Sequence, residues 1–358
     1  MFCALAACSR HAPQSGAEEK VLNLASWSEY IAPDTVPNFE RETGIKVNYE
    51  TYDNNEVLES KLMAGHSNLD VVVPTAGFME RQRRANIYQK LDKTALSNLG
   101  NADPEIMRRL AVDDPGNLYA VPYMFSVTGL GYNVAQVSAR LGNTAPTSWG
   151  LLFDPKSAAK LQDCGIAIID SPLDVFSSAI FYLGHDPNRF DPADIAAASQ
   201  LLANIRPYVR YIDPSQHISD LANGSLCLSL TWAGDLGQAR RRGLESKTGV
   251  TLDFFVPQEG ALIVVDMMAI PVDAPHPRNA LLWLNYLLRP EVIAGITNYI
   301  HYPNGNSASL PLVLPEIRND RTIYPDEETR RRLIPPRAQP DDYVRLMTRE
   351  WTRFRTGS

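Results

Sequence analysis

Aromatic residues stand beside carboxylates where several predicted strands end. Residues 27–30 (Trp-Ser-Glu-Tyr) follow the first strand, residues 232–235 (Trp-Ala-Gly-Asp) follow another, and residues 170–174 supply two aspartates after a third. Because the carboxyl ends of strands in an α/β sheet meet at one crevice, we expect these groups to lie together. Aromatic faces attract ammonium groups at ~0.5–2 kcal/mol each and also cover methylenes. The pattern therefore favours a site for a cation with an apolar body.

Asp266 lies inside an apolar strand expected at residues 262–270. An ionised carboxylate there is costly unless it is paired, so a buried arginine is an alternative partner to a ligand. Taken singly, Trp27 and Trp232 are alternatively core residues, and Glu29 and Asp235 are alternatively helix caps. Their joint occurrence favours one shared site.

Patterns for catalysis, cofactors and metals are weak. Gly129-Leu130-Gly131 lacks the third glycine of the dinucleotide fingerprint, because Val134 takes its place. The six histidines show no i, i+4 ligand pair, and each is expected on the surface or in a loop. We therefore expect no metal, no cofactor and no enzymatic activity. A hydrolase that uses paired carboxylates is the alternative from another class.

Strands and helices alternate along the chain, which is the signature of an α/β fold. Strands are expected at 21–25, 45–49, 70–74, 165–169, 226–231, 251–256 and 262–270, and helices at 34–43, 53–64, 278–288, 290–300 and 341–355. In the helix at 53–64, Asp53 and Glu56 have the spacing of a capping box. No Ser/Gly linker separates the two α/β units, so we expect extended strands to join them as a hinge.

Length and charge narrow the class of protein further. A chain of 358 residues is long enough for two domains with real cores. The net charge of -7 offers no basic surplus for nucleic acid, which we do not expect as a partner. No stretch reaches the ~18 consecutive apolar residues of a membrane span.

Four cysteines occur without CxxC spacing, which argues against a zinc site. Residues 5–8 (Leu-Ala-Ala-Cys) resemble the lipobox at which bacterial lipoproteins are acylated on cysteine, so Cys8 is a candidate for lipidation. The export signal before it would be short, and a frayed tail is the alternative. Cys164 and Cys227 lie in or near predicted strands. Their positions are equally compatible with a disulfide between them and with two free thiols.

In the aromatic and carboxylate segments described above, the sequence resembles the polyamine-binding subunits of bacterial ABC transporters, the spermidine/putrescine-binding periplasmic proteins. The likeness covers nearly everything after residue 20. It is carried by residues 24–35, 70–75, 121–125, 128–133, 232–235 and 302–306. Segments 27–30 and 232–235 are the specific ones, and the others mainly support the fold.

The resemblance implies a two-lobed α/β fold, the type II periplasmic-binding-protein fold, with the ligand in the cleft between lobes joined by a hinge. Lobe one would be residues 21–127 plus 248–301, and lobe two residues 128–247 plus 302–358. Residues 1–20 would be a signal and tether. The resemblance also implies a disulfide between Cys164 and Cys227.

The resemblance assigns roles to the candidate ligand-binding residues. The aromatic box would be Trp27, Tyr30 and Tyr302, with Trp232 as a further wall. The ammonium groups would be held by Glu29, Asp174, Asp235 and Asp266, with hydrogen bonds from Ser28 and Thr75.

Two positions depart from the family pattern. Val264 stands where an aromatic ring is usual, which leaves the box one wall short. Glu29 stands where putrescine-preferring members tend to have aspartate. We therefore expect a periplasmic, monomeric binding protein that passes a polyamine to permease subunits and meets the membrane only through a lipid anchor. The alternative within the fold is a protein for another small cationic or amino-acid-like solute.

Overall fold

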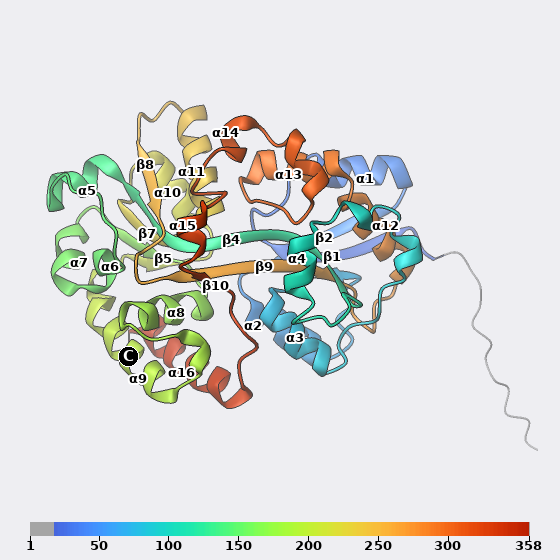
Figure 1. Cartoon of the computed structure of the whole chain (residues 1–358), viewed down its shortest axis with the longest axis horizontal. Coiled ribbons are helices and arrows are strands. Elements are labelled where there is room, and N and C mark those ends of the chain that lie inside the picture. The colour runs from blue at the N-terminus through green and yellow to red at the C-terminus, as the bar shows by residue number, and fades with distance from the viewer. Residues whose placement is uncertain (1–17, 358) are drawn as a thin grey trace, which may run out of the picture.

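The computed structural model describes residues 18–357 (Figure 1), so Cys8 and most of the expected tether lie outside the described residues. Within this range ten strands form one mixed sheet in the order β2-β1-β3-β9-β4-β7-β5-β6, with β10 beside β9 and β8 beside β4. The strands are β1 (Val21–Trp27), β2 (Lys46–Tyr52), β3 (Val71–Val72), β4 (Ala120–Asn133), β5 (Ile166–Ile168), β6 (Tyr211–Ile212), β7 (Leu228–Trp232), β8 (Leu252–Phe255), β9 (Ala261–Ala269) and β10 (Leu333–Ile334).

Helices cover both faces of this sheet (Figure 1), as a sheet with parallel strand pairs requires. The α-helices are α1 (Thr35–Thr43), α2 (Asn55–Met63), α3 (Ala76–Arg84), α4 (Pro104–Leu110), α5 (Val134–Leu141), α6 (Gly150–Phe153), α7 (Pro155–Leu161), α8 (Pro172–Tyr182), α9 (Pro192–Ile205), α10 (Gln216–Asn223), α11 (Ala233–Glu245), α12 (Pro277–Leu287), α13 (Pro290–Ile300), α14 (Pro315–Arg318), α15 (Glu327–Arg330) and α16 (Asp341–Thr356).

Two groups of parallel strands lie on either side of a central antiparallel pair. On one side β1 pairs in parallel with β2 and β3, and on the other β5 pairs in parallel with β6 and β7. Strands β4 and β9 run antiparallel between them and contribute to both sides. The chain therefore passes between two lobes through extended strands, as expected.

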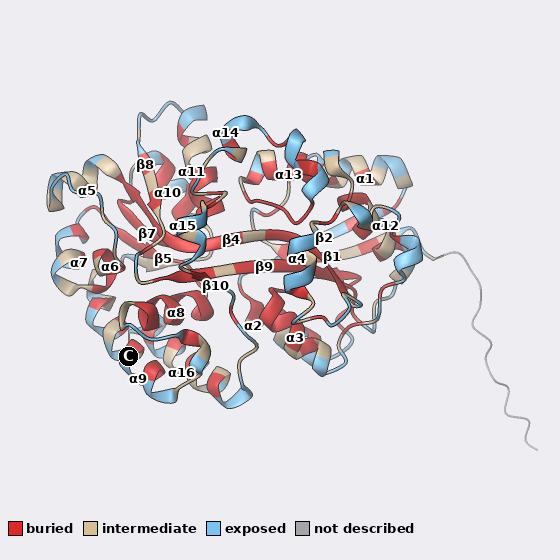
Figure 2. Ribbon diagram, in the orientation of Figure 1, coloured by how far each residue is buried: buried red, intermediate tan, exposed pale blue. Residues whose placement is uncertain are grey.

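Each lobe buries its own hydrophobic core (Figure 2), so the fold is two-lobed. We call the part that contains β1, β2 and β3 the first lobe, and the part that contains β5, β6 and β7 the second lobe. Trp283 and Phe39 are almost fully buried in the first lobe, and Trp149 and Phe153 in the second.

Two segments pack on a different lobe from the one that the resemblance implies for them. Strand β8 pairs with residues 130–133 of β4 in the second lobe. The segment that starts at Tyr302 packs on the first lobe, where Asn304 bridges to Met124 and Val313 lies against Ala294. The exact limits of the lobes remain a prediction. These contacts favour assigning β8 to the second lobe and the segment that starts at Tyr302 to the first lobe.

Cys164 and Cys227 form a disulfide, as the resemblance implies. Cys227 directly precedes β7, and its backbone N–H donates to the carbonyl of Gly165 just before the neighbouring strand β5. Parallel pairing of β5 with β7 thus brings the two cysteines together at the start of both strands. Among the described helices, none combines the length and apolar character of a membrane span.

Candidate functional site

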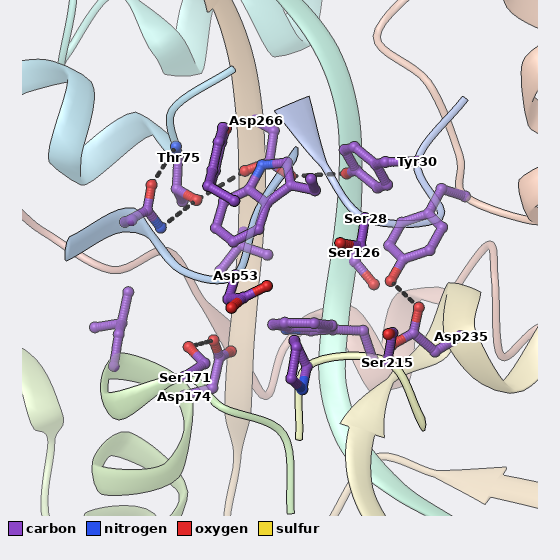
Figure 3. A pocket seen from close by; sticks show the side chains of 18 of the residues that line it. Ser28, Tyr30, Asp53, Thr75, Ser126, Ser171, Asp174, Ser215, Asp235 and Asp266 are labelled. Atoms are coloured by element: carbon purple, nitrogen blue, oxygen red, sulfur yellow. Dashed lines mark hydrogen bonds between the residues drawn. The ribbon is translucent and has the colours of Figure 1, made fainter. Parts of the chain in front are cut away.

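A pocket lies between the two lobes, at the carboxyl ends of their parallel strands (Figure 3). The space inside it amounts to about 660 Å³, including its opening to solvent. Its walls are formed by Trp27, Ser28, Tyr30, Tyr52, Asp53, Asn55, Thr75, Ser126, Ser171, Leu173, Asp174, Pro214, Ser215, Ile218, Trp232, Asp235, Val264, Asp266 and Tyr302. The structure therefore brings together every residue expected in the site except Glu29.

Asp266 on β9 is held by hydroxyl groups rather than by an arginine. Tyr30 donates to its Oδ2 and Thr75 to its Oδ1, each over 2.7 Å. Asn55 in turn donates to the Thr75 hydroxyl over 3.0 Å. Burial raises the pKa of Asp266 to about 6, and these two hydroxyl groups offset part of that rise. The carboxylate is thus oriented and left without a cationic partner within the described chain.

Asp235 lies in the first turn of α11, where the helix N-terminus favours negative charge. Its Oδ1 accepts a hydrogen bond from the Tyr302 hydroxyl over 2.7 Å, which joins the two lobes. Its Oδ2 lies 3.0 Å from Nε2 of His217. His217 is fully buried, so the expectation of a surface or loop position for this histidine is wrong. The cause is the packing of α10 against α11.

Asp174 supplies a third carboxylate from the first turn of α8. Ser171 donates to its Oδ2 over 2.6 Å, and Thr128 donates to its Oδ1. Burial raises the pKa of Asp174, and these hydroxyl groups oppose that rise. The three carboxylates come from both lobes and face one pocket, which therefore carries concentrated negative charge.

Aromatic rings separate these carboxylates. Trp27 and Trp232 lie edge to face with centroids 6.5 Å apart, and Tyr30 and Tyr302 do so at 4.8 Å. The Trp27 indole also donates to the carbonyl of Val73, which fixes the ring on the first lobe. The arrangement offers apolar walls between anionic ends, as the sequence pattern predicts for a cation with an apolar body.

Gly234 makes room for one of these rings. A Cβ atom at this position would lie 2.1 Å from the Tyr302 ring, so a side chain there would displace the tyrosine. The glycine of segment 232–235 is thus explained by the close approach of the first lobe.

Glu29 is not among the residues that line the pocket, unlike the other residues expected in the site. Its backbone turns through a left-handed conformation with φ of 56°, and its side chain points toward the second lobe. There Arg242 donates to its Oε2 over 2.7 Å, and Gln238 donates to its carbonyl. Glu29 therefore contributes an ion pair between the lobes, in which its own side chain is 43% exposed.

Asp53 is a pocket residue that the sequence reasoning missed. The cap of α2 is Asn54, whose side chain accepts from the Val57 N–H, so Asp53 is not needed in the expected capping role. Figure 3 shows Asp53 in the space between Thr75 and Asp174. Its place directly after β2 (Lys46–Tyr52) is the signal that would have identified it, because Asp174 and Asp235 also follow strands.

Small polar residues complete the walls without any sequence pattern of their own. Ser126 lies on β4 directly opposite Val264 on β9, and both line the pocket. Val264 is 7% exposed and leaves this wall aliphatic. Within residues 18–357, no group of three or more His, Cys, Asp or Glu side chains is placed to hold a metal ion.

The fold and the pocket define a two-lobed protein that encloses a small ligand between its lobes. The chain matches the family described as bacterial extracellular solute-binding protein over residues 34–323. It belongs to this family.

Particular relatives are more similar still. A putrescine-binding periplasmic protein of Pseudomonas aeruginosa is 47% identical over 342 residues, which cover 95% of this chain and 93% of the relative. A putrescine-binding periplasmic protein of Escherichia coli is also 47% identical, with the same coverage. A solved structure described as a putative spermidine/putrescine ABC transporter from Listeria monocytogenes superposes with a TM-score of 0.86 at 26% identity, covering 95% of this chain and 100% of that one.

Proposed function

We propose that this protein binds a linear polyamine between its lobes and delivers it to the permease of an ABC transporter, without catalysing a reaction. The observation that carries the proposal is the pair Asp266 and Asp235, two buried carboxylates on different lobes with aromatic rings between them. Asp266 is positioned by two hydroxyl groups, and Asp235 by the Tyr302 hydroxyl and the His217 ring. Each carboxylate matches one ammonium group. The names of the 47% identical relatives support the same ligand class.

The remaining expectations on location and assembly are part of this proposal. The relatives are periplasmic binding proteins rather than enzymes, which supports action outside the cytoplasm. We retain a monomer and a lipid anchor on Cys8 as predictions, the second for a residue outside the described chain. Mass analysis of the mature protein from its own host would show a diacylglycerol at Cys8 or its absence.

Calorimetric titration tests the ligand class. Putrescine, cadaverine and spermidine are expected to bind with a stoichiometry of one, because one pocket encloses the carboxylates. The matched control is 1,4-butanediol, which has the same length as putrescine and no charge and is expected not to bind. Recovery of the unchanged polyamine after incubation would exclude the hydrolase alternative. Absence of heat with all three amines would contradict the proposal.

Val264 offers a test of ligand length. We expect Val264→Trp to strengthen putrescine binding by about two- to tenfold, since an aromatic contact contributes ~0.5–1.5 kcal/mol beyond its buried area. Spermidine should gain less or lose affinity, because the ring takes space beside Ser126 that a longer chain needs. In the native protein we expect spermidine to bind at least as well as putrescine. Titration of both proteins with the three amines decides this, and an unaltered order would show that position 264 does not face the ligand.

Glu29 offers a test of the ion pair between the lobes. We expect Glu29→Gln to weaken putrescine binding by less than about fivefold, because partly exposed ion pairs contribute 1 kcal/mol or less. Arg242→Gln should have the same effect, and the double variant should add little to either. Glu42→Gln is the matched control, since Glu42 pairs with Arg289 within the first lobe. A loss of a hundredfold or more in Glu29→Gln alone would return Glu29 to the ligand contacts.

A further inference from the structure

His217 lies against the pocket carboxylate Asp235 with no exposure to solvent. Its Nε2 is 3.0 Å from Oδ2 of Asp235 and 2.8 Å from the Thr231 hydroxyl. The residue is 0% exposed, and it is placed by the packing of α10 on α11 and by β7 beneath them. A buried titratable side chain thus contacts a group that the proposed function assigns to a ligand ammonium.

The contacts select one tautomer of the imidazole. An ionised carboxylate only accepts hydrogen bonds, so the Nε2 beside Asp235 must carry the proton. The Thr231 hydroxyl donates to the carbonyl of Trp232 over 3.4 Å, which leaves its oxygen free to face Nε2–H. Nδ1 is buried and has no hydrogen-bond partner within residues 18–357. A neutral ring with hydrogen on Nε2 satisfies all of these contacts.

Both carboxylate oxygens of Asp235 therefore have a hydrogen-bond partner within the protein. Tyr302 fixes Oδ1 and His217 fixes Oδ2, one from each lobe. We propose that His217 is a positioning residue for Asp235 and that its protonation state sets polyamine affinity. The neutral ring holds the carboxylate ionised for a ligand ammonium, and the charged ring competes with that ammonium. This inference rests on the proposed function.

Protonation has a definite direction of effect. Histidine is the side chain whose ordinary titration falls between pH 5 and 8. A second proton on Nδ1 would place a positive charge 3.0 Å from Oδ2 and cancel the charge that attracts the ligand. By linkage, a bound ammonium must equally disfavour that proton. Binding at mildly acidic pH should then release a proton from His217.

Other charged groups around His217 are engaged elsewhere. Asp220 on the same helix accepts from Tyr211, and Asp213 accepts from the backbone N–H of Ser215. Arg242 on α11 binds Ser219 and Glu29. Strand β7 carries no ionisable side chain.

The other acidic residues that line the pocket are Asp53, Asp174 and Asp266. Burial raises the pKa of Asp266 to about 6, so Asp266 contributes a pH dependence of its own, which must be separated from any effect of His217.

Calorimetry with putrescine between pH 8 and pH 5.5 makes this separation. The variant His217→Gln keeps a donor toward Asp235 but takes no charge, whereas His217→Phe removes the donor. We expect the affinity of the native protein to fall about tenfold more over this range than that of His217→Gln. At pH 8, His217→Phe should bind more weakly than His217→Gln. His276→Gln is the matched control, because His276 contacts Asp70 outside the pocket and should leave the native profile unchanged.

Proton release and ring chemistry provide further readouts. Titrations at pH 6.5 in buffers of different ionisation enthalpy should show more proton release for the native protein than for His217→Gln. Equal release and equal pH profiles would overturn the proposal, as would undiminished binding by His217→Phe at pH 8.

The histidine ¹⁵N spectrum of the ligand-free protein tests the same proposal without a ligand. His217→Gln or His217→Asn identifies the resonance by its loss. At pH 8 we expect the neutral tautomer with hydrogen on Nε2, and the Nδ1–H tautomer would overturn the proposal. Failure of the proposed function would appear differently, as absence of putrescine binding at every pH with the expected tautomer still present.

Discussion

Asp266→Asn is expected to reduce polyamine affinity at neutral pH by about 30-fold or more. Loss of one partner from a buried charge pair typically costs ~2–5 kcal/mol, and each 1.4 kcal/mol is a factor of ten. Tyr30 and Thr75 have hydroxyl groups that adapt to an amide, so the pocket keeps its shape while the charge disappears. Calorimetric titration with putrescine measures the loss.

The same substitution should stabilise the ligand-free protein. The pKa of Asp266 rises from 3.8 to about 6 on folding, so between pH 4 and pH 6 the folded state keeps a proton that the unfolded chain has lost. Ionising Asp266 therefore lowers the stability of the folded protein. This loss of stability is absent near pH 4, grows as the pH rises to 6 and stays constant above pH 6. At about 1.4 kcal/mol per pH unit it reaches about 3 kcal/mol at pH 7. Asp266→Asn should remove it.

Thermal unfolding of the native protein and the variant at pH 4 and pH 7.5 checks the sign. We expect the melting temperature of Asp266→Asn to exceed the native value at pH 7.5 and to approach it at pH 4. Asp170→Asn is the matched control for binding, because Asp170 is buried, contacts Trp351 and Arg355, and does not line the pocket. If Asp266→Asn retained affinity for putrescine and Asp170→Asn lost it, the assignment of Asp266 to a ligand ammonium would be refuted.

Removal of the disulfide is expected to lower the free energy of unfolding by roughly 4 kcal/mol. The bonded cysteines are 63 positions apart in the sequence, and the chain-entropy treatment gives that magnitude for a loop of this size. Cys164→Ala/Cys227→Ala should leave ligand affinity nearly unchanged, because neither cysteine lines the pocket. The effect thus falls on stability and not on binding.

Urea unfolding with and without a thiol reductant checks this expectation. The reductant should shift the transition of the native protein toward that of the double variant, which itself should not respond. Thiol labelling of the denatured, unreduced native protein should find neither cysteine reactive. Identical transitions for the two proteins without reductant would show that the cross-link contributes nothing.

The sequence predicted the local elements that carry the site because hydrophobic period and strand ends are local signals. Strand β9 was expected at 262–270 and runs over Ala261–Ala269, so Asp266 stood out as a charge among apolar neighbours. The aromatic and carboxylate segments after β1 and β7 were found in the same way. The long strand β4 was missed as a strand, because its Pro122 and two glycines obscure the strand pattern.

Contacts that join distant segments were beyond local reasoning. Asp53 was assigned to a helix cap because the spacing to Glu56 satisfied a local rule, while Asn54 one residue later fulfils that role. His217 was assigned to the surface because no histidine pair marked it, and only the packing of two helices shows its contact with Asp235. Glu29 stands in the family's ligand segment, yet a left-handed turn directs it to Arg242.

The crossing strands also determine how the polypeptide can be divided. The first lobe needs β9 beside β3, with Val72 opposite Ala269, so almost 200 residues of intervening chain must be made before its sheet can close. The second lobe needs the C-terminal helix, whose Trp351 donates to Asp170. Pairing over such separations makes folding slow. Both lobes therefore reach completion late in synthesis, and no single cut in the backbone separates one from the other.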